Sequence, residues 1–235
     1  MRRNSHGVSK IGAFLLVAAL VVPLLVRAVP AVAASDAVEA QGIVTKALAT
    51  FNDFMADSNY SWLHKNLKNA KGVIIYPQVL KAGFILGGSG GTGVLLVRDA
   101  KTGDWSEPAF YTVGSVTFGL QIGGEAAQVI VMAMSQKAID SLLASSVKLG
   151  GDTSVALGPY GTGAETNVTV DFFTFSKTKG IYAGINLNGS VVDVRTKLNK
   201  AYYGKDVTPV DIVVTQKVSN KDSAPLRAAL KKAAK

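Results

Sequence analysis

The stretch that decides the fold is GFILGGSGGTGVLLVRD, residues 83–99. Its glycines Gly88, Gly90 and Gly93 have the G-x-G-x-x-G spacing of dinucleotide-binding turns. Such a turn needs a helix after it, because the helix N-terminus supplies amide groups to the pyrophosphate. Here the segment that follows, VLLVRD, is apolar and β-branched like a strand, and no G-K-[ST] follows it. We therefore expect no nucleotide site, and we expect the glycines to join two strands in a hairpin or to allow close approach of another backbone.

Further strands are predicted on both sides of this stretch. Residues 115–124 (SVTFGLQIGG) and 180–189 (GIYAGINLNG) alternate between apolar and other residues, as strands with one buried face do. Short apolar or aromatic runs closed by turn residues predict more strands at 73–76, 94–98, 129–134, 168–176 and 211–216. The sequence thus predicts six to eight strands in total.

Helical periodicity is clearest in residues 36–56, where apolar residues recur at steps of three and four. These residues are Ala40, Val44, Ala47, Phe51 and Phe54. Residues 62–71 continue helically, and further helical patches are expected at 135–145, 194–203 and 223–235. The strand connections are short and rich in glycine, without regular helical crossovers. We therefore predict an α+β fold with a mainly antiparallel twisted sheet or partly closed barrel, flanked by N-terminal, middle and C-terminal helices.

The N-terminus has the three parts of a secretory signal peptide. A basic start is followed by an apolar run at 11–26, which Pro23 interrupts, and by Ala31 and Ala33 at A-x-A spacing. An uncleaved membrane anchor is the alternative, but a span needs about 20 apolar residues and no central proline. We expect residues 1–33 to be removed, leaving 34–235 as a single exported, soluble domain in the periplasm or the medium.

Composition excludes most catalytic chemistry. The chain has 235 residues, a net charge of +9 and no cysteine, so disulfides, thiolate nucleophiles and zinc–thiolate sites are impossible. His64 is the only histidine after the predicted leader, and no calcium-loop pattern is present. Ser106 and Glu107 are adjacent, but no imidazole lies near them in sequence. We expect no enzyme activity, no catalytic residues, no cofactor, no metal site and no nucleic-acid or nucleotide partner.

Several motifs follow one another in a distinctive order. They are A-K-G before a strand and proline, K-x-G-F, the glycine cluster, W-S-x-P-A-F, G-x-Q-x-G, S-K-x-K-G-I-Y-A-G and Y-Y-G. Together they cover about Trp62 to Gly204, and in this order they resemble the SYLF domain family, which includes actin-patch proteins of yeast.

The resemblance implies lipid binding. Eukaryotic SYLF proteins bind phosphoinositide membranes, with a contribution from an amphipathic helix at the start of the domain, and some yeast members bind actin. The predicted leader and the bare domain look bacterial, so we expect anionic phospholipids of the envelope in place of cytosolic phosphoinositides or actin. A structural or protein-binding role in the envelope is the alternative.

Membrane binding of this kind needs cations that meet phosphates and an interfacial aromatic ring. The helix at 36–56 offers only Lys46 as a cation against three acids, which favours packing on the sheet. Cations are denser just before the first strand of the SYLF motifs. The predicted lipid-binding residues are Lys46, Trp62, Lys65, Lys68 and Lys71.

The leader makes the first testable prediction. The exported form should begin at Ala34 or Ser35 and should stay in solution without detergent, because the apolar run is removed with the leader. N-terminal sequencing of the exported protein checks this, and an exported, membrane-embedded form that begins at Met1 or Arg2 would contradict it.

Overall fold

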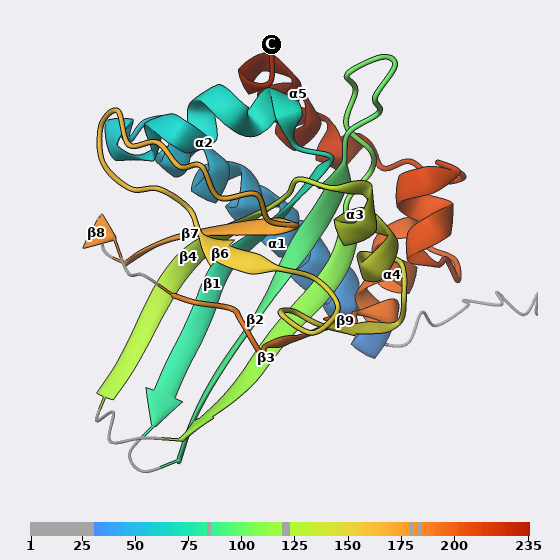
Figure 1. Ribbon diagram of the computed structural model, residues 1–235. Helices are drawn as coiled ribbons and strands as arrows, with labels where there is room; N and C mark the ends of the chain where they lie inside the picture. Colours follow the sequence, from blue (N-terminus) through green and yellow to red (C-terminus); the bar gives the residue numbers. More distant parts are fainter. Residues whose placement is uncertain (1–30, 84–85, 119–122, 179–180, 183–184) are drawn as a thin grey trace, which may run out of the picture.

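The computed structural model describes residues 31–83, 86–118, 123–178, 181–182 and 185–235 (Figure 1). Most of the predicted signal peptide, residues 1–30, lies outside these residues, and its predicted cleavage site falls in the first turn of the first helix. The strands are β1 (Gly72–Gly83), β2 (Leu86–Val97), β3 (Ala109–Phe118), β4 (Gly123–Ala133), β5 (Ser146–Lys148), β6 (Val155–Leu157), β7 (Phe172–Thr178), β8 (Ile181–Tyr182) and β9 (Val191–Val194).

One sheet contains all of these strands. Its main path runs β5-β9-β3-β2-β1-β4-β7-β6, and the two-residue strand β8 pairs with β7. Among the described strands, only the β6–β7 pair is parallel, and the other pairs are antiparallel. The predicted α+β class with a mainly antiparallel sheet is therefore confirmed.

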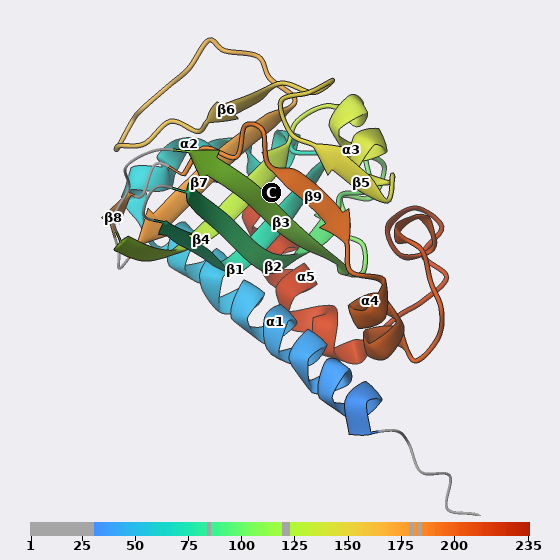
Figure 2. The same ribbon diagram turned by 90° about the horizontal axis from the view of Figure 1, so that it is seen from below.

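Helices lie on both faces of the sheet (Figures 1 and 2). The α-helices are α1 (Ala31–Met55), α2 (Ser61–Asn66), α3 (Gln136–Leu142), α4 (Thr196–Tyr203) and α5 (Ala224–Ala233). The shorter helices are η1 (Ser58–Tyr60), η2 (Leu67–Asn69), η3 (Val210–Val214) and η4 (Lys221–Ser223). Helices α1, α2, α4 and α5 contribute to one apolar cluster with one face of the sheet, and α3 and η3 pack on the other face. The sheet is thus the middle layer of three.

The long helix α1 crosses the sheet with its apolar stripe inward. The five residues predicted to form this stripe are all buried in the same cluster as the sheet. Val38, at the outer side of α1, is 74% exposed. None of the helices that the structure describes is long and apolar enough to cross a bilayer. Helix α1 is therefore a core element, as its few cations predicted.

The central strand β1 contains a bulge at Pro77. Tyr76 and Pro77 together face only Gly93 of β2, and Pro77 and Gln78 together face only Gln128 of β4. Proline has no N–H for the ladder, so inside a sheet it is tolerated at such a bulge. We expected a strand only over 73–76, but β1 continues through the proline to Gly83.

The glycine cluster lies inside β2, opposite this bulge. The hairpin interpretation of these glycines was therefore wrong. Close approach of another backbone is confirmed at Gly93 and also occurs at Gly91, whereas a Cβ at Gly90 would make only an ordinary contact. A Cβ at Gly93 would collide with the carbonyl oxygen of Ile75 and lie 2.6 Å from the Tyr76 ring. A Cβ at Gly91 would collide with the carbonyl oxygen of Gln78. Neither glycine has a positive φ. Glycine is therefore needed at these two positions because a side chain would not fit, and not because of the backbone conformation.

The expected strand at 211–216 is wrong, because Val210–Val214 forms the π-helix η3. Pro209 precedes it in helical conformation, and Asp211 accepts hydrogen bonds from the backbone N–H and the hydroxyl of Thr208. Ile212 and Val213 are buried against the sheet. An apolar run of this length fits a buried helix as well as a strand.

Three other expected strands are only partly correct. In 168–176, the strand β7 begins only at Phe172. In 115–124, residues 115–118 end β3 and 123–124 begin β4, while 119–122 lie outside the described residues. Val116 is 69% exposed, so its expected burial is wrong. In 180–189, the strand β8 covers only two residues, and 183–184 are not described. Ile185 and Leu187 are buried as expected, although they lie outside any strand.

An ion pair between a buried glutamate and a partly exposed arginine holds α5 against the segment before β3. The Arg227 guanidinium donates to Glu107 Oε1 at 2.8 Å and to the carbonyl oxygen of Trp105 at 2.8 Å. The Ser223 hydroxyl donates to the other carboxylate oxygen at 2.7 Å. Trp105 and Phe110 are buried. These contacts connect residues more than 110 positions apart and fix the C-terminal helix in the fold.

The bulge predicts which glycines tolerate a methyl group. Gly93→Ala should lower the free energy of unfolding by about 1–3 kcal/mol, because the added carbon forces backbone or ring atoms to shift. Gly90→Ala is the matched control, since its Cβ would lie 3.6 Å from the carbonyl oxygen of Val113, an ordinary contact. Denaturant unfolding of both variants measures the difference. Equal loss of stability in the two variants would contradict the steric explanation.

The ion pair predicts a second stability effect. Arg227→Met should cost about 2–3 kcal/mol, because the Glu107 side chain is only 5% exposed and would keep a charge without its cation. Lys200→Met, which removes the exposed Lys200–Asp206 pair, is the control and should cost less than about 1 kcal/mol. Thermal unfolding compares the two variants, and a Lys200→Met variant as unstable as Arg227→Met would refute the assignment.

Candidate functional site

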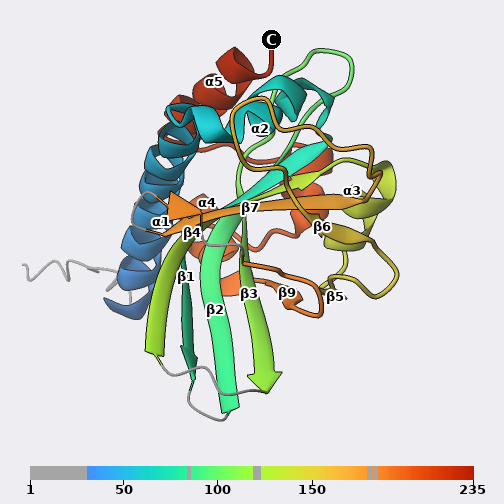
Figure 3. The same cartoon turned by 60° about the vertical axis from the view of Figure 1, so that its left-hand side comes forward.

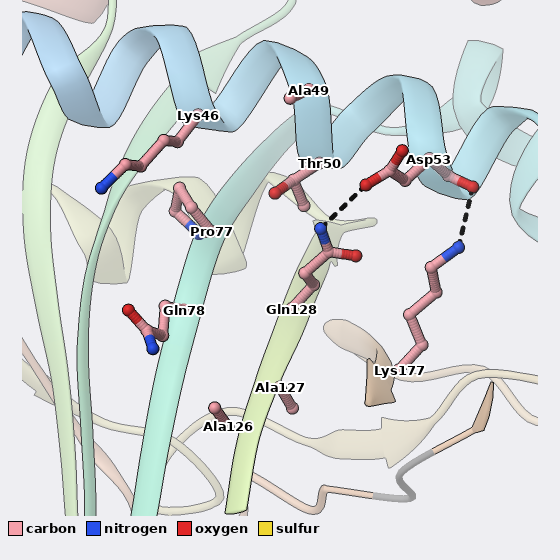
Figure 4. Close-up of a pocket in the computed structure, with 10 residues that line it drawn as sticks. All are labelled: Lys46, Ala49, Thr50, Asp53, Pro77, Gln78, Ala126, Ala127, Gln128 and Lys177. Atoms are coloured by element: carbon pink, nitrogen blue, oxygen red, sulfur yellow. Dashed lines mark hydrogen bonds between the residues drawn. The ribbon is translucent and has the colours of Figure 1, made fainter. Parts of the chain in front are cut away.

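A hollow of about 660 Å³ lies between α1 and the sheet beside the Pro77 bulge. Figure 4 shows its lining, which comes from α1, β1, β4 and β7. The lining residues are Lys46, Ala49, Thr50, Asp53, Pro77, Gln78, Ala126, Ala127, Gln128 and Lys177. The sheet residues that face α1 here are small or polar, which leaves the space open.

Two of the charged residues in this hollow are bonded within the protein. Lys177 donates to the backbone carbonyl of Asp53 at 2.9 Å (Figure 4). Its ammonium lies 3.7 Å from the Asp57 carboxylate. Its ammonium also lies over the rings of Phe54 and Tyr60. The Asp53 carboxylate accepts a hydrogen bond from Gln128 Nε2 at 2.9 Å. Lys177 therefore stabilises the end of α1 more than it offers charge to a ligand.

Lys46 is the available cation of the hollow. It is exposed, and among the described residues it has neither a hydrogen bond nor an ion pair. The same side chain lines a second, shallow depression of about 540 Å³ along α1. The other residues of this depression are Ala37, Val38, Gln41, Gly42 and Thr45. Lys46 thus lines both depressions, and each of them exposes more apolar than polar surface.

The three other predicted lysines lie together at the beginning of β1, on or just after α2 and η2. Lys65 pairs with Glu165 at 3.0 Å, but both side chains are more than half exposed, so the pair is weak. Lys68 and Lys71 are exposed and have no ion pair within the described residues. The structure does not bring Lys46 to them, because Lys46 lies beside Gln78, about 20 Å further along β1.

Tertiary structure adds cations that the sequence interpretation missed. The Arg98 guanidinium donates to the carbonyl oxygen of Lys68 at 3.0 Å, and Lys231 of α5 pairs with Asp104 at 2.6 Å. The turn at 98–105 and the C-terminal helix therefore join the lysine cluster (Figure 1). We call this surface the basic end; it consists of Lys65, Lys68, Lys71, Arg98, Lys101, Lys231 and Lys232.

Carboxylates of the same turn offset part of this charge. Backbone N–H groups of Thr102 and Lys101 hold the pKa of Asp99 below its usual value. The hydrogen bond from Lys231 lowers the pKa of Asp104. Both carboxylates are therefore ionised at neutral pH, and Lys68, Lys71, Lys101 and Lys232 are the exposed cations that have no ion pair among the described residues.

Trp62 does not lie at the surface. Its side chain is only 7% exposed, and its ring centroid lies 4.6 Å from that of Phe173 and 5.9 Å from that of Phe175. The interfacial role expected for this ring is therefore wrong. The physical reason is that the α2 face carrying Trp62 and Leu63 packs on the sheet, while the lysines of the same segment face solvent.

The adjacent Ser106 and Glu107 form no catalytic pair. The Ser106 hydroxyl donates to the carbonyl oxygen of Glu107 and accepts from the N–H of Val97, and the Glu107 carboxylate binds Arg227 and Ser223. His64 is partly buried and bonds the carbonyl oxygen of Phe54 through Nε2 at 2.9 Å. No group of three or more candidate metal ligands occurs within the described residues.

Comparison with known proteins identifies the family. The sequence profile described as "Ysc84: Las17-binding protein actin regulator" matches residues 114–233, about half of the chain. The chain is 38% identical over 149 residues to "SH3 domain-containing protein PJ696.02" of Schizosaccharomyces pombe, covering 60% of this chain and 34% of that protein. It is 32% identical over 152 residues to "SH3 domain-containing YSC84-like protein 1" of Homo sapiens, covering 63% of this chain and 44% of that protein.

A third relative is "Protein YSC84" of Saccharomyces cerevisiae, which is 35% identical over 149 residues, covering 60% of this chain and 31% of the relative. The chain thus spans less than half of the length of each of these proteins. The profile match includes the segment from the middle of β3 to α5 and therefore most of the second half of the fold. On this match, the chain belongs to the Ysc84 family of SYLF domains.

Proposed function

We propose that this chain is a non-enzymatic, exported lipid-binding domain that docks on anionic phospholipid or phosphoinositide membranes. The observation that carries the proposal is the basic end, where cations from three separate segments share one surface. Each cation near an anionic bilayer contributes about 1 kcal/mol of attraction, so a cluster is needed for stable docking. The description of the matched family, "Las17-binding protein actin regulator", names binding and regulation, which agrees with a binding role.

A protein partner is the second candidate, and one structural observation favours it. The distal halves of β1–β4 extend past the helices (Figure 3), and Leu80 and Val116 are 55% and 69% exposed there. An uncovered sheet face with large apolar side chains is typical of an interaction surface. The names of the matched family and of LAS seventeen-binding protein 3 of Saccharomyces cerevisiae also point to protein partners for those proteins.

Vesicle binding distinguishes the two candidates. The double variant Lys68→Gln/Lys71→Gln should weaken co-sedimentation with phosphatidylglycerol vesicles at low salt by on the order of thirtyfold, because two cations of about 1 kcal/mol each are lost. Added salt should also weaken vesicle binding of the parent, because salt screens the attraction between the lysines and the phosphates.

The matched control is Lys148→Gln/Lys197→Gln, which removes the same charge from exposed positions on β5 and α4. This variant should bind the vesicles as the parent does. Equal losses in both variants would mean that net charge alone acts and that the basic end is not the docking surface. A parent that ignores anionic vesicles at low salt would refute lipid docking and leave the protein-partner role.

A further inference from the structure

The far ends of β1–β4 form one continuous surface on the α1 side of the sheet (Figure 3). Val94 of β2 belongs to the apolar cluster of α1, and alternate residues of a strand point to the same side, so Gly90 and Gly88 continue this side. The strand register extends it into two rows of four residues across β4, β1, β2 and β3. The first row is Ala126, Leu80, Gly90 and Gly114, and the second is Gly124, Ala82, Gly88 and Val116. We call these eight residues the distal face.

The distal face is apolar and open to solvent. None of its eight residues has a polar or charged side chain, and Leu80 and Val116 are 55% and 69% exposed. The opposite side of the same four strands has a row of polar residues at this level. This row is Glu125, Lys81, Ser89 and Ser115. An antiparallel sheet normally turns its polar side to water, so the exposed apolar side indicates a surface that another molecule covers.

The two rows fit each other in size. Each row contains one large side chain, Leu80 in the first and Val116 in the second, and the other six residues are glycine or alanine. A second copy, turned over about a twofold axis that runs across the strands between the rows, places the first row of each copy on the second row of the other. Leu80 then lies over Ala82 of the second copy, and Val116 lies over Gly114. No large side chain meets another large side chain.

We propose that the distal face binds the distal face of a second copy of this chain about this twofold axis. The inference rests on the protein-binding role given above as the second candidate function, and it names the partner. A twofold interface requires a surface that is complementary to itself, which is the property that the two rows have. A different protein would need only an apolar surface of its own and would not require the rows to match each other.

Helix α1 determines the direction of the axis. An axis along the strands would also place Leu80 over a glycine, Gly90, but it would bring the two α1 helices to the same level between the sheets. Packed sheets lie about 10 Å apart, and one helix with its side chains already has a diameter of about 10 Å. An axis across the strands places each α1 beyond the strand ends of the other copy. The hollow beside α1 includes Ala126 of the distal face, so space remains at this boundary.

The size of the distal face determines the strength of the dimer. Four strands about 4.8 Å apart are about 19 Å wide, and the strand length from Gln78 to the end of β1 is about 17 Å. The resulting area of about 320 Å² is less than half of the roughly 800 Å² per partner in a stable interface. We therefore expect a weak, reversible dimer. Lys71 lies about 30 Å from Leu80 along β1, so dimerisation leaves both basic ends accessible.

Sedimentation equilibrium of the exported protein tests the dimer. Between about 10 and 500 μM, a range suited to a small interface, the mass should rise from that of the monomer toward a plateau at twice that value. Leu80→Lys and Val116→Lys should each weaken dimerisation about tenfold or more, because each places an ammonium group against an apolar surface. Val168→Lys is the matched control, since it adds the same charge at a position that is 56% exposed outside the distal face, and it should dimerise as the parent does.

A charge pair tests the direction of the axis. Leu80→Lys and Ala82→Glu should each dimerise weakly alone, whereas an equimolar mixture should associate about tenfold more tightly, because the two new charges face each other across the axis. Recovery in a mixture of Leu80→Lys with Gly90→Glu, and not with Ala82→Glu, would show an axis along the strands and overturn the proposed arrangement.

The remaining outcomes separate this inference from lipid docking. A mass that stays at the monomer value up to about 500 μM overturns the dimer, and vesicle docking through the basic end is then unaffected. A mass that rises past the dimer without a plateau also overturns it, because the copies then associate in an open series. A dimer that both lysine variants retain lies on another surface. Lys68→Gln/Lys71→Gln should dimerise as the parent does, so a loss of vesicle docking with a retained dimer refutes lipid docking alone.

Discussion

The bulge at Pro77 is the constraint on which the rest of the structure depends. A proline in a central strand cannot donate to the ladder, so both neighbouring strands must accommodate an extra residue at the same level. On one face the displaced backbone and the Tyr76 ring occupy the space that side chains at Gly91 and Gly93 would need. Gly91 and Gly93 of β2 are thus the steric complement of the bulge in β1.

The same bulge produces the hollow beside α1. Pro77 and Gln78 face Gln128 as two residues against one, and all three line the space between helix and sheet. Beyond the bulge, small side chains such as Ala126 replace the large apolar residues that hold α1 on the sheet closer to α2. The hollow is therefore a consequence of how the central strand is built. Its α1 residues lie outside the segment 114–233 that defines the family match.

A second organising contact is the ion pair of Glu107 and Arg227. It fixes α5 against the turn before β3, and in doing so it brings Lys231 next to Asp104 and near the lysines of α2 and η2. The basic end therefore joins cations of residues 65–101 with those of α5, which lie more than 100 positions further along the chain. The Glu107 carboxylate accepts hydrogen bonds from Ser223 and Arg227. Its role beside Ser106 is therefore structural.

The sequence by itself determined the features that depend on local periodicity and composition. The buried stripe of α1, the α+β class and the exclusion of thiolate chemistry follow from residue spacing and residue types, which act over a few positions. Within the predicted site, the exposure of Lys68 and Lys71 also follows from local residue spacing and residue types. Only the tertiary structure decided that β1 continues through Pro77, that Val210–Val214 is helical and that Trp62 is buried. In each case a distant segment supplies the packing surface or the hydrogen-bond partner, and no local pattern contains that information.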